Sequence, residues 1–166
     1  MIVFQGRVLS VEVETIRLPN GRDYQVETVR HRPSVVLLPM RDDHHVILVR
    51  QYRHSIGRHT WELPAGSLEA AELAETAAAR ECEEEIALVP GTIEQLRQLF
   101  PAPGFCDEEL IFFRLSNLRP PPLHSPYRPD EDEDIHAEVF TVEDARAMVG
   151  RGEIVDLKTA YGLTLI

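Results

Sequence analysis

The chain has 166 residues, which is enough for one domain but leaves no room for a second catalytic module. Its content of 43% hydrophobic and 27% charged residues excludes collagen, coiled coil and wholesale disorder, and a net charge of −11 argues against binding to the phosphates of DNA or RNA. Apolar runs such as Val35–Leu38 are far shorter than the roughly 20 residues of a membrane helix, and no basic segment precedes an apolar stretch at the start. We therefore expect a cytoplasmic protein with no membrane partner. Its two cysteines, Cys82 and Cys106, are too few for a disulfide framework and are expected to be reduced.

The N-terminal part of the chain has the pattern of β-strands. Valine and glutamate alternate over residues 11–14, the turn residues Pro-Asn-Gly stand at 19–21, and the alternation resumes over 24–28, which predicts a hairpin. The continuous apolar runs 35–38 and 46–49 predict two inner strands that are buried on both faces of a sheet.

The composition then changes to that of a helix. Alanine, glutamate and leucine dominate residues 68–88, and apolar residues recur there every three or four positions. Strands are predicted at 110–113 and around 137–140, and a helix capped by Thr141 is predicted to end at Gly150, before a last amphipathic stretch that begins at Asp156. This order predicts an α+β fold in which helices flank a mixed sheet.

Three carboxylates share one face of the helix predicted at 68–88. Glu81, Glu84 and Glu85 stand at positions i, i+3 and i+4. Crowding like charges in this way costs a few tenths of a kcal/mol per pair, and a hard divalent cation such as Mg²⁺ would offset that cost. The alternative is an acidic helix face that is merely solvated, which is common in proteins.

The spacing around these carboxylates identifies a longer motif. Gly66, Glu72, Arg80–Glu81 and Glu84–Glu85 match the Nudix box, G-x5-E-x7-R-E-U-x-E-E-x-G-U, where U is aliphatic. On this motif the sequence resembles the Nudix hydrolases.

The chain departs from the box at two positions. Cys82 replaces an aliphatic residue, and it is expected to pack as a small hydrophobic side chain. Ala87 replaces the late glycine, and alanine does not adopt a positive φ as readily as glycine does. Neither change removes a carboxylate, so they concern the geometry of the helix end rather than the motif itself.

Outside the box, the resemblance extends to the ADP-ribose pyrophosphatase branch. LVRQYR at 48–53 and WELPAG at 61–66 are similar to a strand and a loop of that branch, and Pro103 stands fifteen residues after Leu88, as a proline does there. The resemblance implies a Nudix fold, an α/β/α sandwich preceded by antiparallel N-terminal strands. It also implies a single domain spanning 1–166, with a catalytic core over 33–166.

The resemblance implies a metal-dependent reaction. Water would attack a phosphorus of ADP-ribose and yield AMP and ribose 5-phosphate, with Mg²⁺, or Mn²⁺, neutralising charge and activating the water. Glu81 and Glu85 are expected to be the main ligands, Glu84 to hold a second ion and the Ala65 carbonyl to complete a site. Arg80 is expected to face away from the carboxylates and to assist catalysis by orienting a glutamate, or else to form only a surface ion pair.

An acidic run at 130–134 resembles the loop from which these enzymes draw a catalytic glutamate. We expect Glu131 to be the general base, with Glu133 as the second choice. The alternative is that the run is a solvated lid, as charge runs usually are.

Five residues are candidates for binding the substrate. Arg53 is expected to bind phosphate through its planar guanidinium, and Arg50 and Arg30 are weaker candidates for the same role. Phe105 and Glu108 are expected near the adenine or ribose, although Phe105 could equally be an ordinary core residue.

Two other functions remain open. The first is a Nudix hydrolase of another nucleotide sugar, a dinucleoside polyphosphate or a nucleoside triphosphate. The second is a Nudix module that binds ADP-ribose without cutting it, but the presence of all three box glutamates favours an enzyme.

The resemblance also implies a homodimer in which the N-terminal strands, residues 1–32, contribute to the substrate site of the other subunit. A hairpin alone is marginally stable in water, so its apolar face needs a partner surface. The alternative is that the hairpin folds back on its own core.

Overall fold

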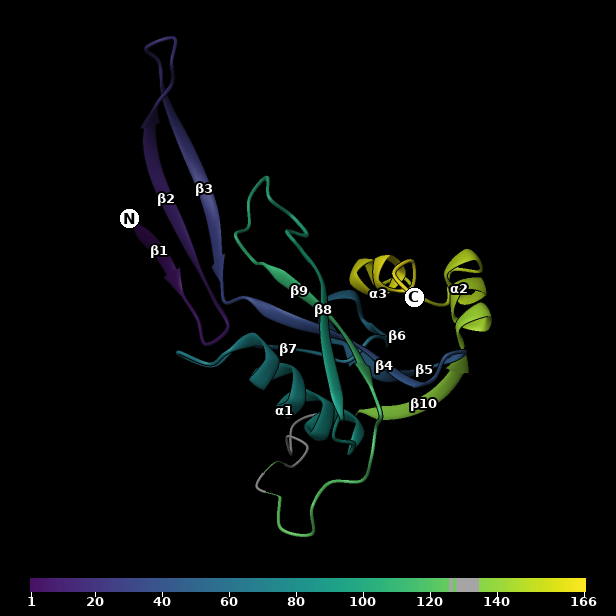
Figure 1. Ribbon diagram of the computed structural model, residues 1–166. Helices are drawn as coiled ribbons and strands as arrows, with labels where there is room; N and C mark the ends of the chain where they lie inside the picture. Colours follow the sequence, from purple (N-terminus) through teal and green to yellow (C-terminus); the bar gives the residue numbers. More distant parts are fainter. Residues whose placement is uncertain (126, 128–134) are drawn as a thin grey trace.

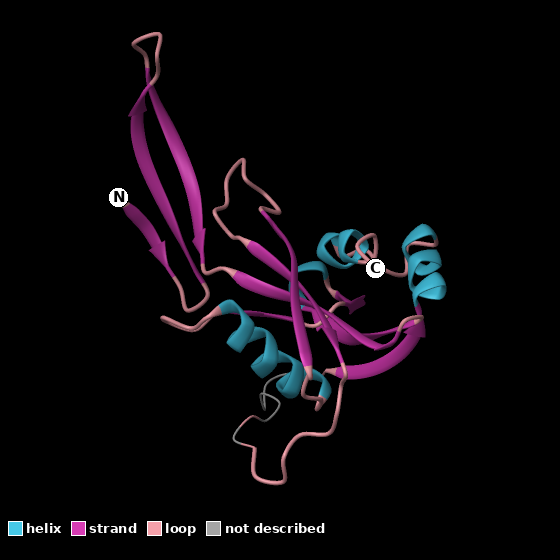
Figure 2. Ribbon diagram, in the orientation of Figure 1, coloured by secondary structure: helices cyan, strands magenta, loops and turns pink. Residues whose placement is uncertain are grey.

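The computed structural model describes residues 1–125, 127 and 135–166. In Figures 1 and 2 the N-terminal strands form a small sheet that extends away from the body of the molecule. This sheet consists of β1 (Ile2–Gln5), β2 (Leu9–Arg17) and β3 (Asp23–His31), all antiparallel, in the order β1-β2-β3. The predicted hairpin is therefore confirmed, and Gly21 in its turn has a φ of 82°. Strand β1 was not predicted.

The larger sheet is mixed. Its strands run in the order β10-β5-β4-β9-β8, while β6 pairs with β5 and β7 pairs with β4. The β4–β9 pair is parallel and the others are antiparallel. Its members are β4 (Ser34–Asp42), β5 (His45–Arg53), β6 (Arg58–Glu62), β7 (Ala65–Ser67), β8 (Thr92–Leu99), β9 (Leu110–Ser116) and β10 (His136–Thr141), with a short 3-10 helix, η1 (His54–Ile56), after β5.

Helices cover both faces of this sheet (Figure 1). Helix α1 (Ala74–Ile86) packs on the face that holds Val35 and Leu37, whereas α2 (Val142–Gly150) and α3 (Leu157–Gly162) lie over the face that holds Val36 and Leu38. Because successive side chains of a strand point to opposite faces, both faces need apolar residues, and the continuous runs provide them. The predicted α+β fold, a mixed sheet between helices, is confirmed.

Helix α1 is shorter than the helix predicted at 68–88. Ala71 has a left-handed backbone with φ 63°, and the Glu72 side chain accepts a hydrogen bond from the Glu69 N–H at 2.9 Å. These features make the six residues before Ala74 a loop, although their composition is that of a helix.

The C-terminal end of α1 is formed by Ala87, the residue that replaces the late glycine of the box. Ala87 takes the left-handed conformation, φ 54° and ψ 38°, and its N–H bonds to the Glu83 carbonyl at 3.0 Å. Cys82 is buried between α1 and the sheet, as expected for a small hydrophobic side chain, and burial raises the pKa of its thiol to about 12.

Helix α2 has the predicted start, and the amphipathic stretch predicted from Asp156 begins with helix α3. Thr141 accepts the Asp144 N–H at 3.0 Å and caps α2. Asp156 accepts the Thr159 N–H at 3.0 Å and caps α3. None of the helices in the described residues is long and apolar enough to span a membrane.

The N-terminal sheet is joined to the body of the molecule through the loop between β8 and β9. The Val29 N–H donates to the Phe105 carbonyl at 2.7 Å, and the Asp107 N–H donates to the Val29 carbonyl at 3.1 Å, with Val29 and Cys106 forming an isolated bridge. Arg30 adds an ion pair with Asp107 at 3.1 Å. The same loop continues to Glu108, so the N-terminal sheet is connected to the site described next.

Candidate functional site

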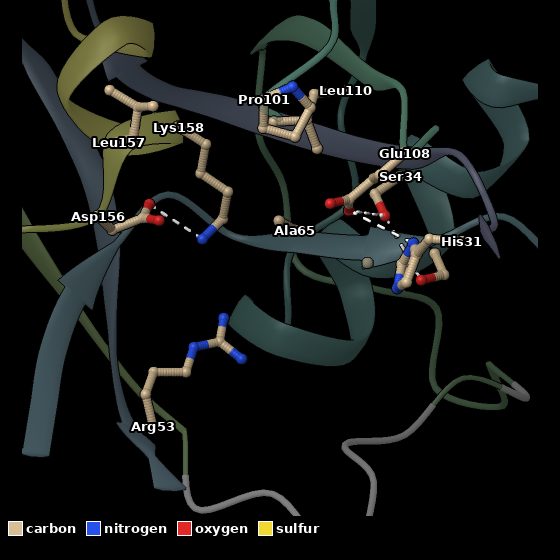
Figure 3. Close-up of a pocket in the computed structure, with 12 residues that line it drawn as sticks. His31, Ser34, Arg53, Ala65, Pro101, Glu108, Leu110, Asp156, Leu157 and Lys158 are labelled. Carbon is tan, nitrogen blue, oxygen red and sulfur yellow. Dashed lines mark hydrogen bonds and ion pairs between the residues drawn. The ribbon is translucent and has the colours of Figure 1, made fainter. Parts of the chain in front are cut away.

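A cavity of about 350 Å³ lies where β4, β7, α3 and the loop before β9 meet. Figure 3 shows charged side chains from these distant parts of the sequence around one space, with Ala65 near its centre. Its lining residues are His31, Ser34, Arg53, Ala65, Gly66, Ser67, Pro101, Glu108, Leu110, Asp156, Leu157 and Lys158.

The box glutamate Glu81 reaches the wall of this cavity at Gly66. A Cβ atom at Gly66 would overlap the Glu81 carboxyl group. Any larger residue at position 66 would therefore displace the Glu81 carboxylate from this position. The consequence is that the Glu81 carboxylate lies against the backbone of β7, next to Ala65.

Arg80 does not face away from the carboxylates, contrary to the prediction. Its Nη1 donates to Glu81 Oε1 at 2.6 Å and to Glu84 Oε2 at 2.8 Å, while Nε and Nη2 donate to Glu72 at 3.0 and 2.9 Å. Nη2 also donates to the Ser67 carbonyl at 3.2 Å. The Arg80 side chain is therefore directed toward β7 and the loop before α1, where Ser67 and Glu72 bind it. The expected contact with a glutamate is confirmed.

The burial of this cluster decides between the two roles expected for Arg80. Its side chain is only 11% exposed, so the surface ion pair considered as an alternative is wrong. The hydrogen bonds to Glu72, followed by the charge of Glu81, raise the pKa of Arg80, and the same hydrogen bonds lower the pKa of Glu72. Glu72 and Arg80 therefore stay ionised and hold two box carboxylates in place.

The box donors fit a hard divalent cation in their chemistry, since all of them are carboxylate or carbonyl oxygens. Within residues 1–125, 127 and 135–166, however, no three Asp, Glu, His or Cys side chains already converge as metal ligands would. Arg80 binds Glu81 and Glu84 instead, and a cation would have to share these carboxylates with it.

Arg53 lines the cavity and is held by Glu62. Its Nε and Nη2 donate to the two carboxylate oxygens of Glu62, each at 2.7 Å. This bond raises the pKa of Arg53, with smaller contributions from the charges of Asp156 and Glu85. The third box glutamate, Glu85, therefore acts electrostatically on Arg53.

Glu62 is the centre of a buried charge cluster. Its side chain is 3% exposed and accepts hydrogen bonds from Arg53, Thr60 and Lys158. Burial alone would raise the pKa of Glu62, but the hydrogen bonds from Arg53 and the charge of Lys158 outweigh burial and lower it to about 2. Lys158 also forms an ion pair with Asp156 at 3.0 Å (Figure 3).

The structure brings only some of the predicted substrate residues to the cavity. Arg53, Ala65 and Glu108 line it. Arg50 is exposed on β5 and is not a lining residue, while Phe105 is 61% exposed on the loop before β9, so the core role considered for Phe105 is wrong. The predicted bases Glu131 and Glu133 lie outside the described residues.

Several lining residues were not predicted, among them His31 and Ser34. Both lie beside the predicted Glu108: its Oε1 accepts a hydrogen bond from Ser34 Oγ at 3.1 Å and lies 3.5 Å from Nδ1 of His31, so β3 and β4 add polar groups to the cavity. Asp156 and Lys158 come from the C-terminal stretch. Their spacing carries no motif, so only the fold could show that they reach the cavity.

Comparisons with known proteins agree with this geometry. The profile of the NUDIX domain family matches residues 30–158. An ADP-ribose pyrophosphatase of Bacillus subtilis is 35% identical over 97% of this chain and 86% of its own length, and an ADP-ribose pyrophosphatase of Mycobacterium tuberculosis is 36% identical over 97% and 77%. A crystal structure of an ADP compounds hydrolase superposes with a TM-score of 0.86 at 22% identity, over 99% of this chain and 88% of that one. The chain therefore belongs to the Nudix family.

Proposed function

We propose that this Nudix protein is a pyrophosphohydrolase that splits ADP-ribose into AMP and ribose 5-phosphate with a divalent metal ion. The observation that carries the proposal is the position of the Glu81 carboxylate, which lies against Gly66 in the wall of the cavity that Arg53 also lines. Metal-binding carboxylates and a phosphate-binding cation are thereby brought to one space. The two relatives named ADP-ribose pyrophosphatase support the choice of substrate.

Glu81, Glu84 and Glu85, with the carbonyl of Ala65, would hold the ion, which we propose to be Mg²⁺, with Mn²⁺ as a substitute. A bound divalent ion supplies neutralisation of phosphate charge and acidification of the attacking water. Arg80 fixes the orientation of Glu81 and Glu84 through its hydrogen bonds to both, so the carboxylates are positioned before the ion arrives.

Arg53 binds the diphosphate of the substrate. Nε and Nη2 are used by Glu62, whereas Nη1 makes no hydrogen bond to a described residue and can donate to a phosphate oxygen. Glu108 lies across the cavity, where its carboxylate can accept a hydrogen bond from a ribose hydroxyl. Arg50 and Phe105 are weaker candidates because neither lines the cavity of this chain.

Glu131 is the general base in this proposal, and Glu133 is the second choice. The described acids that line the cavity are already engaged, since Glu108 accepts from Ser34 and Asp156 accepts from Thr159 and pairs with Lys158. A base supplied by the acidic segment that precedes β10 would leave these contacts intact.

The protein acts as a homodimer in this proposal, through the N-terminal sheet. Exposed apolar side chains gather in its first strand and the turn after it, where a monomer would leave them in water. They are Ile2, Val3, Phe4 and Val8. The sheet extends from the body of the molecule in Figure 1, so the alternative in which the hairpin packs back on its own core receives no support.

The test is identification of the products after incubation with ADP-ribose and Mg²⁺, beside a panel of nucleotide sugars, dinucleoside polyphosphates and nucleoside triphosphates. AMP and ribose 5-phosphate in equal amounts are expected, with no turnover when the metal is chelated. Faster turnover of another compound would make that compound, rather than ADP-ribose, the preferred substrate. Binding of ADP-ribose without cleavage would show that the protein is a binding module and not an enzyme.

A further inference from the structure

The C-terminal helix α3 is fixed to the end of β6 by Lys158 and Thr159 of its first turn. Asp156 caps the helix through the Thr159 N–H, and Thr159 Oγ1 accepts the backbone N–H of Leu63 at 2.7 Å. A Cβ atom at Gly162 would overlap a methyl group of Leu63, so the helix lies very close to this strand end. The backbone of Lys158 is thus held in place by the contacts of Asp156 before it and Thr159 after it.

Lys158 is the only lysine in the chain, whose other side-chain cations at neutral pH are arginines. Its side chain is 15% exposed, and Nζ binds Glu62 as well as Asp156. Glu62 thereby serves two cations, because it also accepts the two-pronged bond from Arg53. In Figure 3 the ends of Lys158 and Arg53 point toward the same space near Ala65.

The charges of this cluster balance only when Lys158 is present. Arg53 and Lys158 face Glu62 and Asp156, so two positive charges meet two negative ones. Without Lys158, a net negative charge would remain beside a cavity proposed to receive a diphosphate, and Glu62 would be compensated by Arg53 alone. Both changes weaken the attraction between Arg53 and an anion.

We propose that Lys158 is a positioning residue for substrate binding: by sharing the Glu62 carboxylate it leaves Arg53 able to bind the diphosphate. The inference rests on the proposed function in taking the ligand to be a diphosphate. It extends that function by giving α3, which lies outside the Nudix box, a part in anion recognition.

The test compares the unaltered protein with Lys158→Met, Lys158→Gln and Lys158→Arg. Arg151→Met is the matched control, because it removes an exposed cation whose ion pair is with Glu153, on the loop after α2. Calorimetry with inorganic pyrophosphate in the presence of a chelator measures anion binding without catalysis. Lys158→Met is expected to weaken this binding about tenfold or more, while Lys158→Arg and Arg151→Met stay close to the unaltered protein.

Steady-state kinetics with ADP-ribose and Mg²⁺ give a second measurement. A positioning role in binding predicts that Lys158→Met raises KM about tenfold and changes kcat little. A merely structural role would instead lower kcat and the melting temperature together and would not be rescued by arginine. If Lys158→Met fails to fold, Lys158→Gln keeps an N–H donor for Glu62 while removing the charge, and the same comparison is made with it.

The unaltered protein offers a further check. Because the chain has one lysine, ¹³C-labelled lysine gives a single side-chain Cε resonance, and pyrophosphate must shift it. No shift, no pyrophosphate binding, or unchanged binding in Lys158→Met would each overturn the inference. Pyrophosphate binding that depends on Lys158, in a protein that does not hydrolyse ADP-ribose, would instead overturn the proposed function and leave the inference standing.

Discussion

The backbone N–H of Ala87 donates to the Glu83 carbonyl at 3.0 Å while Ala87 itself holds a left-handed conformation with φ 54°. The bond closes the last turn of α1, which contains Glu84 and Glu85. An L-residue with a Cβ pays roughly 1–2 kcal/mol for this conformation, whereas glycine adopts it freely. This alanine therefore strains the end of the helix that carries the proposed metal ligands.

Ala87→Gly is expected to stabilise the protein by about 0.5–1 kcal/mol, since relief of the left-handed strain exceeds the extra entropy of glycine in the unfolded chain. Urea unfolding measures the change. Ala79→Gly, inside α1, is the matched control and should destabilise by about 1 kcal/mol. Equal destabilisation by both changes would contradict the strain at Ala87.

The free energy of unfolding should fall at acidic pH because Glu62 becomes protonated there. Its folded pKa of about 2 lies below the ordinary value of 4.5, so its contribution is complete above about pH 4.5 and is lost as the pH falls toward 2. The shift corresponds to about 3 kcal/mol. The difference in unfolding free energy between the unaltered protein and Glu62→Gln should therefore shrink from pH 6 to pH 3. A constant difference would show that Glu62 is not held ionised by its partners.

Glu85→Gln should lower kcat by at least about a hundredfold with Mg²⁺, because a hard cation needs the charge that the amide lacks. The melting temperature should change little. Glu75→Gln, on the exposed first turn of α1, removes the same charge away from the site and should leave turnover normal. Near-normal turnover of Glu85→Gln would remove Glu85 from the ligand set.

Glu131→Gln should depress kcat with little change in KM, since a general base contributes roughly 10²–10⁴ in rate and acts in the transition state. Glu133→Gln is the comparison. If the Glu133 change is the more damaging one, the two roles are exchanged. If both are mild, the acidic run is not the source of the base.

Light scattering should give twice the chain mass of 18.9 kDa at micromolar concentration. Phe4→Glu places a charge among the exposed apolar side chains of β1 and should shift the protein toward the monomer. Tyr24→Glu, at the far end of the N-terminal sheet, tests how far the interface extends. A mass near that of one chain for the unaltered protein would rule out the dimer.

The strands that could be predicted from the sequence are those whose pattern of apolar residues follows directly from which of their faces are buried. The runs at 35–38 and 46–49 are apolar without interruption because both faces of β4 and β5 are covered. Strand β8 escaped prediction because it is an edge strand, and most of Thr92–Leu99 is exposed and polar. Its hydrogen bonds to β9 depend on tertiary pairing that no local pattern records.

The site divides in the same way. The box placed Glu81 and Arg80 correctly on one helix, but helical register could not give the direction of the Arg80 side chain. Glu72 and the Ser67 carbonyl determine that direction from outside the helix. Lys158 stands about a hundred residues from Glu62, so only the packing of α3 on β6 could reveal their contact.

The two cysteines differ in a way that is useful for spectroscopy. Cys82 is enclosed under α1, and a thiol with a pKa of about 12 carries almost no thiolate at neutral pH, so alkylating reagents should spare it. Cys106 is only partly buried, on the loop that joins Val29 to the cavity residue Glu108. A maleimide dye should therefore attach at one place, and its fluorescence would report both on the N-terminal sheet and on occupation of the cavity, with no engineered residue in the chain.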